Sequence, residues 1–496
     1  MMQWGTLRER LLARHIPGPG VWLACLVLVA VLALPTPDNL PLAGHRVLAI
    51  LAFAVTLWLT QAVSYEVSAV MIVALIAFGV GLSPSLSQPD QMMGTSTALK
   101  LAMSGFTSGG TVLVAAALFI SVAMTLTGLD KRIAMLILSW IGVGYGRILI
   151  STLLVTVVLS LFVPSATARV ACVVPIMMGM IAAFGEERDS PFAAGVMIMV
   201  AQATSVWNVG IQTAGAQNLL TTSFIQRVSG ESLDWLTWFV AGAPWSLIMS
   251  VVLFFVVRWA MPAHAHGIEG GRERLKAQLA ELGPMSRNEK MLLWVVLGLL
   301  VMWATGGKLH PFDTASVTVV GLAVLLLPGI GVMDWKQVQS RIPWGTLVVF
   351  GVGISLGSAL LATQAGQWLG NTVVQGLGLD DVAPFWLLAA LSLFLIVIHL
   401  GFASATALTS TMMPIMLALL VALDQVQNVP GLAMLLGFAI SFGFILPINA
   451  PQNMVCIGTH TFTSGQFAKV GVPVTLIGYG LMLLMAATWW HWLGLL

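Results

Sequence analysis

Charged residues are scarce in this chain. Only 8% of its 496 residues are Asp, Glu, Lys or Arg, about a third of the share that soluble globular proteins carry. That scarcity excludes an ordinary soluble enzyme and a disordered scaffold, both of which need many more charges. The formal net charge is +2, which gives no signal for binding a polyanion such as a nucleic acid.

Cysteine and acidic residues are few as well. The three cysteines, Cys25, Cys172 and Cys456, lie in apolar runs without disulfide or metal-ligand spacing, so we expect them to pack inside helices. Asp and Glu are nearly missing from the apolar runs, and no hydroxyl there has an adjacent base. A membrane-embedded enzyme needs a metal cluster, a nucleophile–base pair or paired carboxylates, so we expect no enzyme activity.

Apolar sequence is what the chain has in abundance. Hydrophobic residues make up 58% of it, in long runs without the alternation of a transmembrane barrel. Since a helix crosses the hydrocarbon core with about 20 apolar residues, we predict an all-α polytopic membrane protein with about eleven crossings. The predicted spans are 21–34, 47–63, 67–82, 112–127, 192–220, 238–257, 291–305, 315–332, 345–361, 432–448 and 470–484. The longer regions 148–184 and 385–423 are predicted to be re-entrant hairpins, although two crossings each would give the same orientation.

Lysine and arginine positions set the predicted orientation, because short cytoplasmic loops are enriched in them. Arg8, Arg10 and Arg14 precede the first span and place the N-terminus in the cytoplasm of a bacterial cell, with the chain in its inner membrane. Asp380, Asp381 and the C-terminus then lie outside. The charged segment before residue 291 is predicted to face the cytoplasm. The same is predicted for Lys131, Arg132, Arg147, Arg188, Lys336, Arg341 and Lys469.

Two segments recur in the same order in the two halves of the chain. Ser165-Ala-Thr-Ala-Arg returns as Ser404-Ala-Thr-Ala-Leu, and Ala214-Gly-Ala-Gln-Asn returns as Asn449-Ala-Pro-Gln-Asn. The copies start on opposite sides of the membrane under the charge assignment, which predicts an inverted repeat, the architecture of many secondary transporters. We therefore expect a first repeat over 1–260 with its tip at 165–167, a cytoplasmic linker over 261–289, and a second repeat over 290–496 with its tip at 404–406.

Each Ser-Ala-Thr tip places two hydroxyls and several backbone N–H groups at the N-terminus of a helix. Such a terminus binds anions through its unpaired donors and its positive dipole end. The small residues and proline around Gly215 and Pro451 break a helix, which frees carbonyls for a cation and N–H groups for an anion. Two tips facing two breaks predict one midplane site for a small anion. Helix packing through Ser, Thr and Gly is the alternative interpretation.

Two ionisable side chains fall inside the predicted hairpins. Arg169 lies one helical turn after Ser165, and a charged residue within a membrane is functional by default. It is a candidate to neutralise a substrate carboxylate or to replace a coupling ion, or else to pair with a group on a neighbouring helix. His399, shortly before Ser404, is a titratable candidate for proton coupling or a satisfied packing residue.

The motifs resemble those of the divalent anion:sodium symporter family of carboxylate and sulfate transporters. Pro164-Ser-Ala-Thr-Ala-Arg169 and Ser404-Ala-Thr-Ala407 resemble the family's paired Ser-Asn-Thr tips, and Pro447-Ile-Asn-Ala-Pro-Gln-Asn453 resembles its helix break. Ile342-Pro-Trp-Gly-Thr-Leu-Val-Val-Phe-Gly351 resembles a segment that opens a scaffold span. The resemblance covers almost the whole chain. It implies a scaffold domain that forms a homodimer and a transport domain that moves as an elevator.

The resemblance also implies which residues meet the transported ions. The substrate is expected to be a C4-dicarboxylate, a tricarboxylate or sulfate, bound at Ser165, Thr167, Ser404 and Thr406. The helix breaks add Gly215 and Pro451 to this set, and the charge inside the first hairpin adds Arg169. Sodium, as coupling ion, is expected between each tip and the facing break, at Ser165, Ala166, Ala405 and Asn449.

The chain departs from the family pattern at both tips, where Ala166 and Ala405 stand in place of asparagine. In the family that amide helps to bind both substrate carboxylate and sodium, so we hypothesise that Asn449 restores one amide to the second half. Arg169 is similar to a feature of the family's sodium-independent exchangers. Sodium-coupled uptake is the first expectation, with dicarboxylate or citrate exchange and sulfate transport as alternatives. A channel or a receptor has less need of the repeat.

Overall fold

The computed structural model describes residues 18–141, 144–263, 277 and 279–496. Within these residues every regular element is a helix and no strand is formed, which confirms the predicted all-α class. Several residues used for the predicted orientation, among them Arg8, Arg10 and Arg14, lie outside the described residues, as does about half of the predicted linker over 261–289.

Eight helices of the described part are long and apolar enough to cross a membrane. They are α3 (Leu42–Thr60), α6 (Gly109–Thr127), α8 (Tyr145–Phe162), α10 (Pro191–Gly210), α12 (Trp235–Ala260), α14 (Arg287–Thr305), α17 (Trp344–Ala362) and α23 (Ser464–Ala487). Shorter apolar helices are α2 (Pro19–Ala33), α4 (Tyr65–Gly81), α9 (Ala166–Ala183), α15 (Thr314–Leu326), α19 (Pro384–His399), α20 (Ala405–Val421) and α21 (Val429–Ile440). The remaining connecting helices are α5 (Thr95–Met103), α7 (Leu129–Ile141), α11 (Ala216–Ser229), α16 (Trp335–Gln339), α18 (Ala365–Leu377), α22 (Pro451–Ile457) and α24 (Trp489–Trp492). The chain is therefore a multi-pass membrane protein.

Both regions predicted as hairpins consist of two helices joined by a short turn. In the first, α8 ends at Phe162 and α9 begins at Ala166. The hydroxyl of Ser165 caps α9 by accepting a hydrogen bond from the N–H of Ala168 at 3.3 Å. Ser404 caps α20 in the same way, with a donor–acceptor distance of 3.3 Å. The recurring serine thus starts the same element in both halves.

Each hairpin is followed by a helix that breaks and resumes. Between α10 and α11 lies the short 3-10 turn η1 (Gln212–Ala214), and between α21 and α22 lies its counterpart η2 (Pro447–Asn449). The residues after these turns, Gly215 (φ −145°, ψ 142°) and Ala450 (φ −148°, ψ 139°), share one extended conformation. The breaks predicted around Gly215 and Pro451 are therefore present, with matching backbone geometry.

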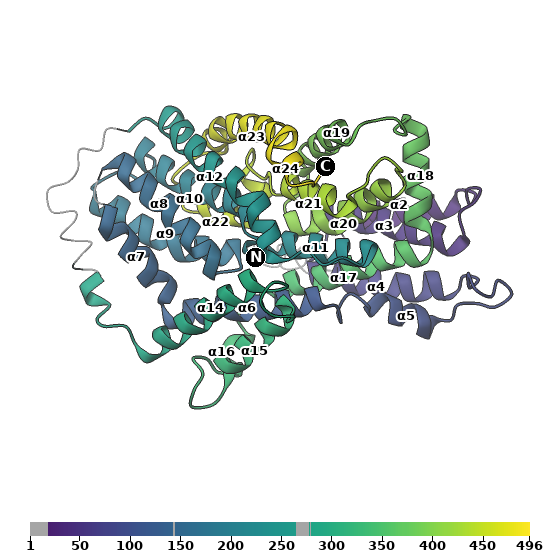
Figure 1. Ribbon diagram of the computed structural model, residues 1–496, viewed down its shortest axis with the longest axis horizontal. Helices are drawn as coiled ribbons and strands as arrows, with labels where there is room; N and C mark the ends of the chain where they lie inside the picture. The colour runs from purple at the N-terminus through teal and green to yellow at the C-terminus, as the bar shows by residue number, and fades with distance from the viewer. Residues whose placement is uncertain (1–17, 142–143, 264–276, 278) are drawn as a thin grey trace, which may run out of the picture.

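The two halves pack into each other crosswise. Helix α9 of the first hairpin contacts α22 of the second half, and α20 of the second hairpin contacts α11 of the first half. Helix α10 is buried along its whole length, between α8, α9, α12 and α22. Figure 1 shows α7, α8, α9 and α10 grouped at one end of the molecule and α3, α4 and α5 at the other. This packing brings both tips and both breaks to one place.

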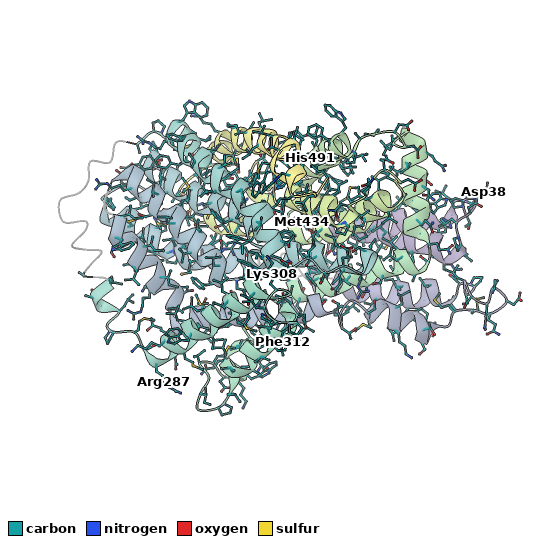
Figure 2. All side chains as sticks on the ribbon, viewed as in Figure 1. Asp38, Arg287, Lys308, Phe312, Met434 and His491 are labelled. Atoms are coloured by element: carbon teal, nitrogen blue, oxygen red, sulfur yellow. The ribbon has the colours of Figure 1, made fainter. Side chains whose placement is uncertain are left out.

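Large apolar side chains cover much of the outer surface. Trp22, Trp140, Trp259 and Trp294 are between 60% and 86% exposed, which suits contact with lipid rather than with water. Charged side chains such as Asp38 and Arg287 lie at the periphery (Figure 2). The surface thus has the composition that the scarcity of charge predicts.

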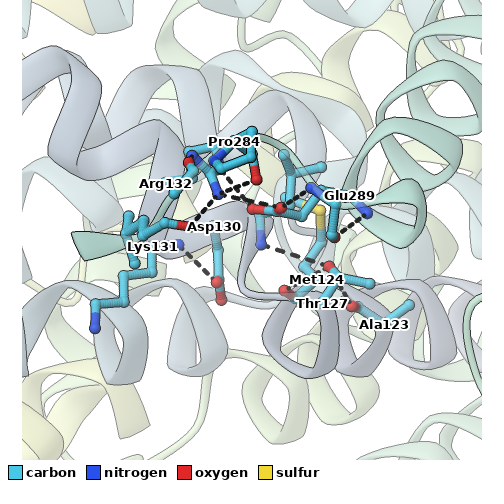
Figure 3. A network of polar contacts seen from close by, with 12 residues as sticks. Ala123, Met124, Thr127, Asp130, Lys131, Arg132, Pro284 and Glu289 are labelled. Atoms are coloured by element: carbon cyan, nitrogen blue, oxygen red, sulfur yellow. Dashed lines mark hydrogen bonds and ion pairs between the residues drawn. The ribbon is translucent and has the colours of Figure 1, made fainter. Parts of the chain in front are cut away.

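One ion pair fastens the end of the central segment to the first half (Figure 3). The Nε of Arg132, on α7, donates to Oε1 of Glu289 at 2.5 Å. The same guanidinium donates to the carbonyls of Leu282 and Gly283, at 3.1 and 2.9 Å. Both charged side chains are less than 10% exposed, so the pair holds the start of α14 against α7.

Candidate functional site

The two tips and the two breaks line one cavity of about 580 Å³. Six residues of the expected substrate set contribute to its wall: Ser165, Thr167, Ser404, Thr406, Gly215 and Pro451. The alanines at the two tips, Ala166 and Ala405, also face it. Segments that are far apart in the sequence therefore meet at a single site.

Two helix N-termini open on this cavity. The capping of α9 by Ser165 uses the N–H of Ala168, which leaves the N–H groups of Ala166 and Thr167 outside the helical hydrogen-bond ladder. The same holds at the start of α20 for Ala405 and Thr406. Each terminus adds its positive dipole end to these donors, so the two together favour a ligand with two negative groups.

Three side-chain amides that were not predicted from the sequence also line the cavity: Asn208, Gln217 and Gln452. Gln217 and Gln452 hold the same place in the two copies of the second motif. Gln217 donates through Nε2 to the hydroxyl of Ser441, and Gln452 donates to the hydroxyl of Ser205, at 3.3 and 3.2 Å. Each bond joins one half to the other. The repeated glutamine was the signal that could have revealed Gln217 and Gln452.

Asn218 and Asn453, the last residues of the two copies of the second motif, bind backbone carbonyls near the two helix breaks. The Nδ2 of Asn218 donates to the carbonyl of Asn208 at 2.6 Å and to that of Ile211 at 3.1 Å. The Nδ2 of Asn453 donates to the carbonyl of Gly443 at 2.9 Å. Carbonyls released where each helix stops thus find side-chain partners, which keeps an irregular backbone stable inside the membrane.

Arg169 does not line the cavity, unlike the other residues of the expected substrate set. Its side chain is 1% exposed. The terminal nitrogen Nη1 donates to the carbonyls of Val163 and Ala214, at 2.8 and 2.9 Å. The other terminal nitrogen, Nη2, donates to Oδ1 of Asn208 at 2.5 Å. The guanidinium therefore lies behind the wall and ties the first tip to the first break.

Asn449 also lies behind the wall rather than in it. Its Nδ2 donates to the carbonyls of His399 and Phe402, at 2.7 and 3.1 Å. Its Oδ1 accepts from the N–H of Leu446 at 3.1 Å. Because both ends of the amide bind backbone, this position disagrees with the hypothesis that Asn449 gives an amide to the substrate. The side chain ties the second tip to the second break.

His399 also connects the second hairpin to the second helix break. Its Nε2 lies 3.1 Å from the backbone carbonyl of Asn449. A carbonyl can only accept, so Nε2 carries the proton. The imidazole is buried at 1% exposure and does not line the cavity, so it acts on the tip–break junction.

Residues of neighbouring helices close the rest of the cavity. Ser121 and Thr125 come from α6, Tyr65 from α4, and Thr346 from α17. Arg341, which precedes α17, is the one arginine of the described lining. It gives the cavity wall a positive charge that attracts an anion.

A second cavity of about 580 Å³ lies beside the first. Thr125 and Cys172 line both cavities. The wall of the second cavity also includes the charged residues Asp130, Lys131 and Glu281. The two cavities are therefore neighbours that share part of one wall.

Comparison with known proteins agrees with this architecture. Residues 20–496 match the family described as the sodium:sulfate symporter transmembrane region. The chain is 60% identical to a membrane protein of Cupriavidus necator over 96% of its length and 93% of the relative. It is 26% identical to the sodium-dependent dicarboxylate transporter SdcS of Staphylococcus saprophyticus, over 94% of this chain and 90% of that one. The fold is similar to that of the YdaH transporter of Alcanivorax borkumensis, with a TM-score of 0.57, 14% identity, and coverage of 89% and 98%.

Proposed function

The chain belongs to the sodium:sulfate symporter family, and from this premise we propose that it carries a small divalent organic anion across the bacterial inner membrane. The family makes it a transport protein and not an enzyme. A single observation supports the dianion: two serine-capped helix N-termini open on one cavity. The 26% identical relative named as a dicarboxylate transporter favours a C4-dicarboxylate over a tricarboxylate or sulfate.

The proposed binding mode assigns one carboxylate to each tip. At the first tip the hydroxyls of Ser165 and Thr167 and the N–H groups at the start of α9 receive one carboxylate. At the second, Ser404 and Thr406 do the same at the start of α20. A carboxylate gains charge-assisted hydrogen bonds at each end, so a monocarboxylate would leave one terminus unmatched.

The proposed movement is that of an elevator within an inverted repeat. The two hairpins and the two broken helices would move together, because they interlock through the crosswise packing of α9 with α22 and of α20 with α11. The other apolar helices would form the scaffold and the interface of a homodimer. The predicted orientation, with the N-terminus in the cytoplasm and the C-terminus outside, belongs to the same proposal.

Transport by purified protein in liposomes tests the proposal. We expect labelled succinate to accumulate or exchange, with citrate and sulfate as comparison anions. Replacing Thr406 by Val keeps the volume and removes a cavity hydroxyl, so we expect the KM for succinate to rise about tenfold, as for one hydrogen bond to a charged group. Thr475→Val, on α23 away from the cavity, is the matched control. If none of the three anions is transported under any gradient, the proposal is refuted.

Two coupling schemes follow from the family and from the site. The name of the 26% identical relative supports sodium-coupled uptake. The position of Arg169 between the first tip and the first break supports sodium-independent exchange. The second scheme rests on an observation of this chain itself.

A further inference from the structure

Sodium held between a tip and a break needs oxygen donors there, chiefly backbone carbonyls. In the first half the facing carbonyls are those of Val163, in the turn of the hairpin, and Ala214, in the break. Nη1 of Arg169 donates to both, at 2.8 and 2.9 Å. A positively charged N–H group therefore already bridges the oxygens that a sodium ion would bridge. The residues of this junction do not fit sodium.

The second junction is closed by different side chains in the same places. Phe402 precedes Ser404 as Val163 precedes Ser165, and Asn449 begins its motif as Ala214 does. The carbonyl of Phe402 accepts from Nδ2 of Asn449 at 3.1 Å. The carbonyl of Asn449 accepts from Nε2 of His399 at 3.1 Å. Here too the paired carbonyls face N–H donors of the chain itself.

The charge of Arg169 reaches the cavity through Asn208. Its partners are two backbone carbonyls and the amide oxygen of Asn208, with no acidic side chain among them. Because Oδ1 of Asn208 accepts from the guanidinium, Nδ2 is the group that Asn208 presents to the cavity it lines. An anion in the cavity therefore meets an amide donor that a positive charge holds in place and polarises.

We propose that Arg169 is a permanent substitute for a coupling cation, so that this protein exchanges divalent anions without sodium. This inference rests on the proposed function. A sodium ion leaves with the substrate, and the empty carrier then crosses without the added charge. Arg169 cannot leave, so an empty carrier would move its charge together with the positive dipole ends of α9 and α20, about two positive charges in all. A bound dianion neutralises them, and moving them through the membrane without the anion is costly. The loaded carrier crosses more easily, and release of one anion is followed by binding of another.

Counterflow in proteoliposomes tests the inference. Vesicles loaded with unlabelled succinate receive labelled succinate outside, in sodium or in choline buffer. We expect equal rates in the two buffers within about twofold, and at least tenfold slower uptake into vesicles without internal anion. Transport that requires sodium overturns this inference and leaves the proposed function intact. Absence of transport of succinate, citrate and sulfate in both buffers refutes the proposed function and the inference with it.

Variants at two equivalent positions separate the charge from the fold. Arg169→Ser removes the guanidinium and frees both carbonyls, so we expect counterflow in choline to fall at least tenfold and sodium to restore part of it. Arg169→Lys keeps a charge and retains sodium-independent exchange. Leu408 holds the equivalent place in the second copy, and Leu408→Met is the control. An Arg169→Ser variant with the wild-type rate in choline contradicts the inference.

A measurement on the wild-type protein avoids dependence on the folding of the variants. Sodium bound to the native state would raise the thermal midpoint above that in choline or potassium at equal ionic strength. We expect the same midpoint in all three salts. A rise specific to sodium refutes the inference.

Discussion

Asn449 offers the sharpest test of what a motif residue does in this fold. Replacing it by Ala removes three hydrogen bonds to the backbone of Leu446, His399 and Phe402. At about 0.6 kcal/mol each, the average for hydrogen bonds between membrane helices, their loss costs about 2 kcal/mol. The N–H of Leu446, which is partly buried, and the carbonyl of the buried Phe402 lose their side-chain partner, which raises the cost to as much as about 4 kcal/mol.

The assay is unfolding in mixed micelles by a denaturing detergent, followed through tryptophan fluorescence. We expect Asn449→Ala to lower the free energy of unfolding by about 2–4 kcal/mol. Because the amide does not line the cavity, the KM for succinate should stay within about threefold among molecules that remain folded. Unchanged stability together with a KM raised tenfold or more would show that Asn449 binds substrate directly, and the reasoning from its contacts would be refuted.

Two further predictions concern other parts of the molecule. Cys172 lines both cavities, so a maleimide should label it in a Cys25→Ser background, and saturating succinate should slow that labelling at least fivefold; labelling that succinate, citrate and sulfate leave unchanged would place the anion elsewhere. Glu289→Gln leaves the buried charge of Arg132 unneutralised and should cost about 3–5 kcal/mol of unfolding free energy, whereas the double change to Met at both positions should recover most of it. Equal losses in the single and double variants would show that the unneutralised charge of Arg132 is not what destabilises the single variant.

The sequence predicted the tips and the breaks because their chemistry is local. A serine before a helical run is a capping signal wherever it stands, and Ser165 and Ser404 both cap. Small residues and proline around Gly215 and Pro451 disfavour a continuous helix whatever packs against them. The repeat then made it reasonable to expect these four segments in one site.

The direction of Arg169 was harder to foresee. Its spacing from Ser165 places both on one helical face, but side chains on a helix tilt toward its N-terminus. A long arginine near the first turn of α9 therefore reaches back past the capping serine to the carbonyl of Val163. A buried cation seeks carbonyl oxygens at short range, and the break supplies a second one at Ala214.

Asn208 could not be found from the sequence at all. It lies inside the apolar stretch 192–220 without a partner in the second motif. Only the position at which α10 stops brings its amide to the cavity wall. A residue whose role depends on where a helix ends in space leaves no local pattern.

The crosswise bonds of Gln217 with Ser441 and of Gln452 with Ser205 have a consequence for how such a protein can originate. In each bond, one half of the chain supplies the donor and the other half supplies the acceptor. A half-length chain would therefore hold a glutamine whose partner serine is missing. It would also hold a single tip with no second tip opposite it. It could build this cavity only by pairing with another copy of itself. Within the single chain the two copies need not be identical, and Arg169 and Leu408 stand at equivalent positions.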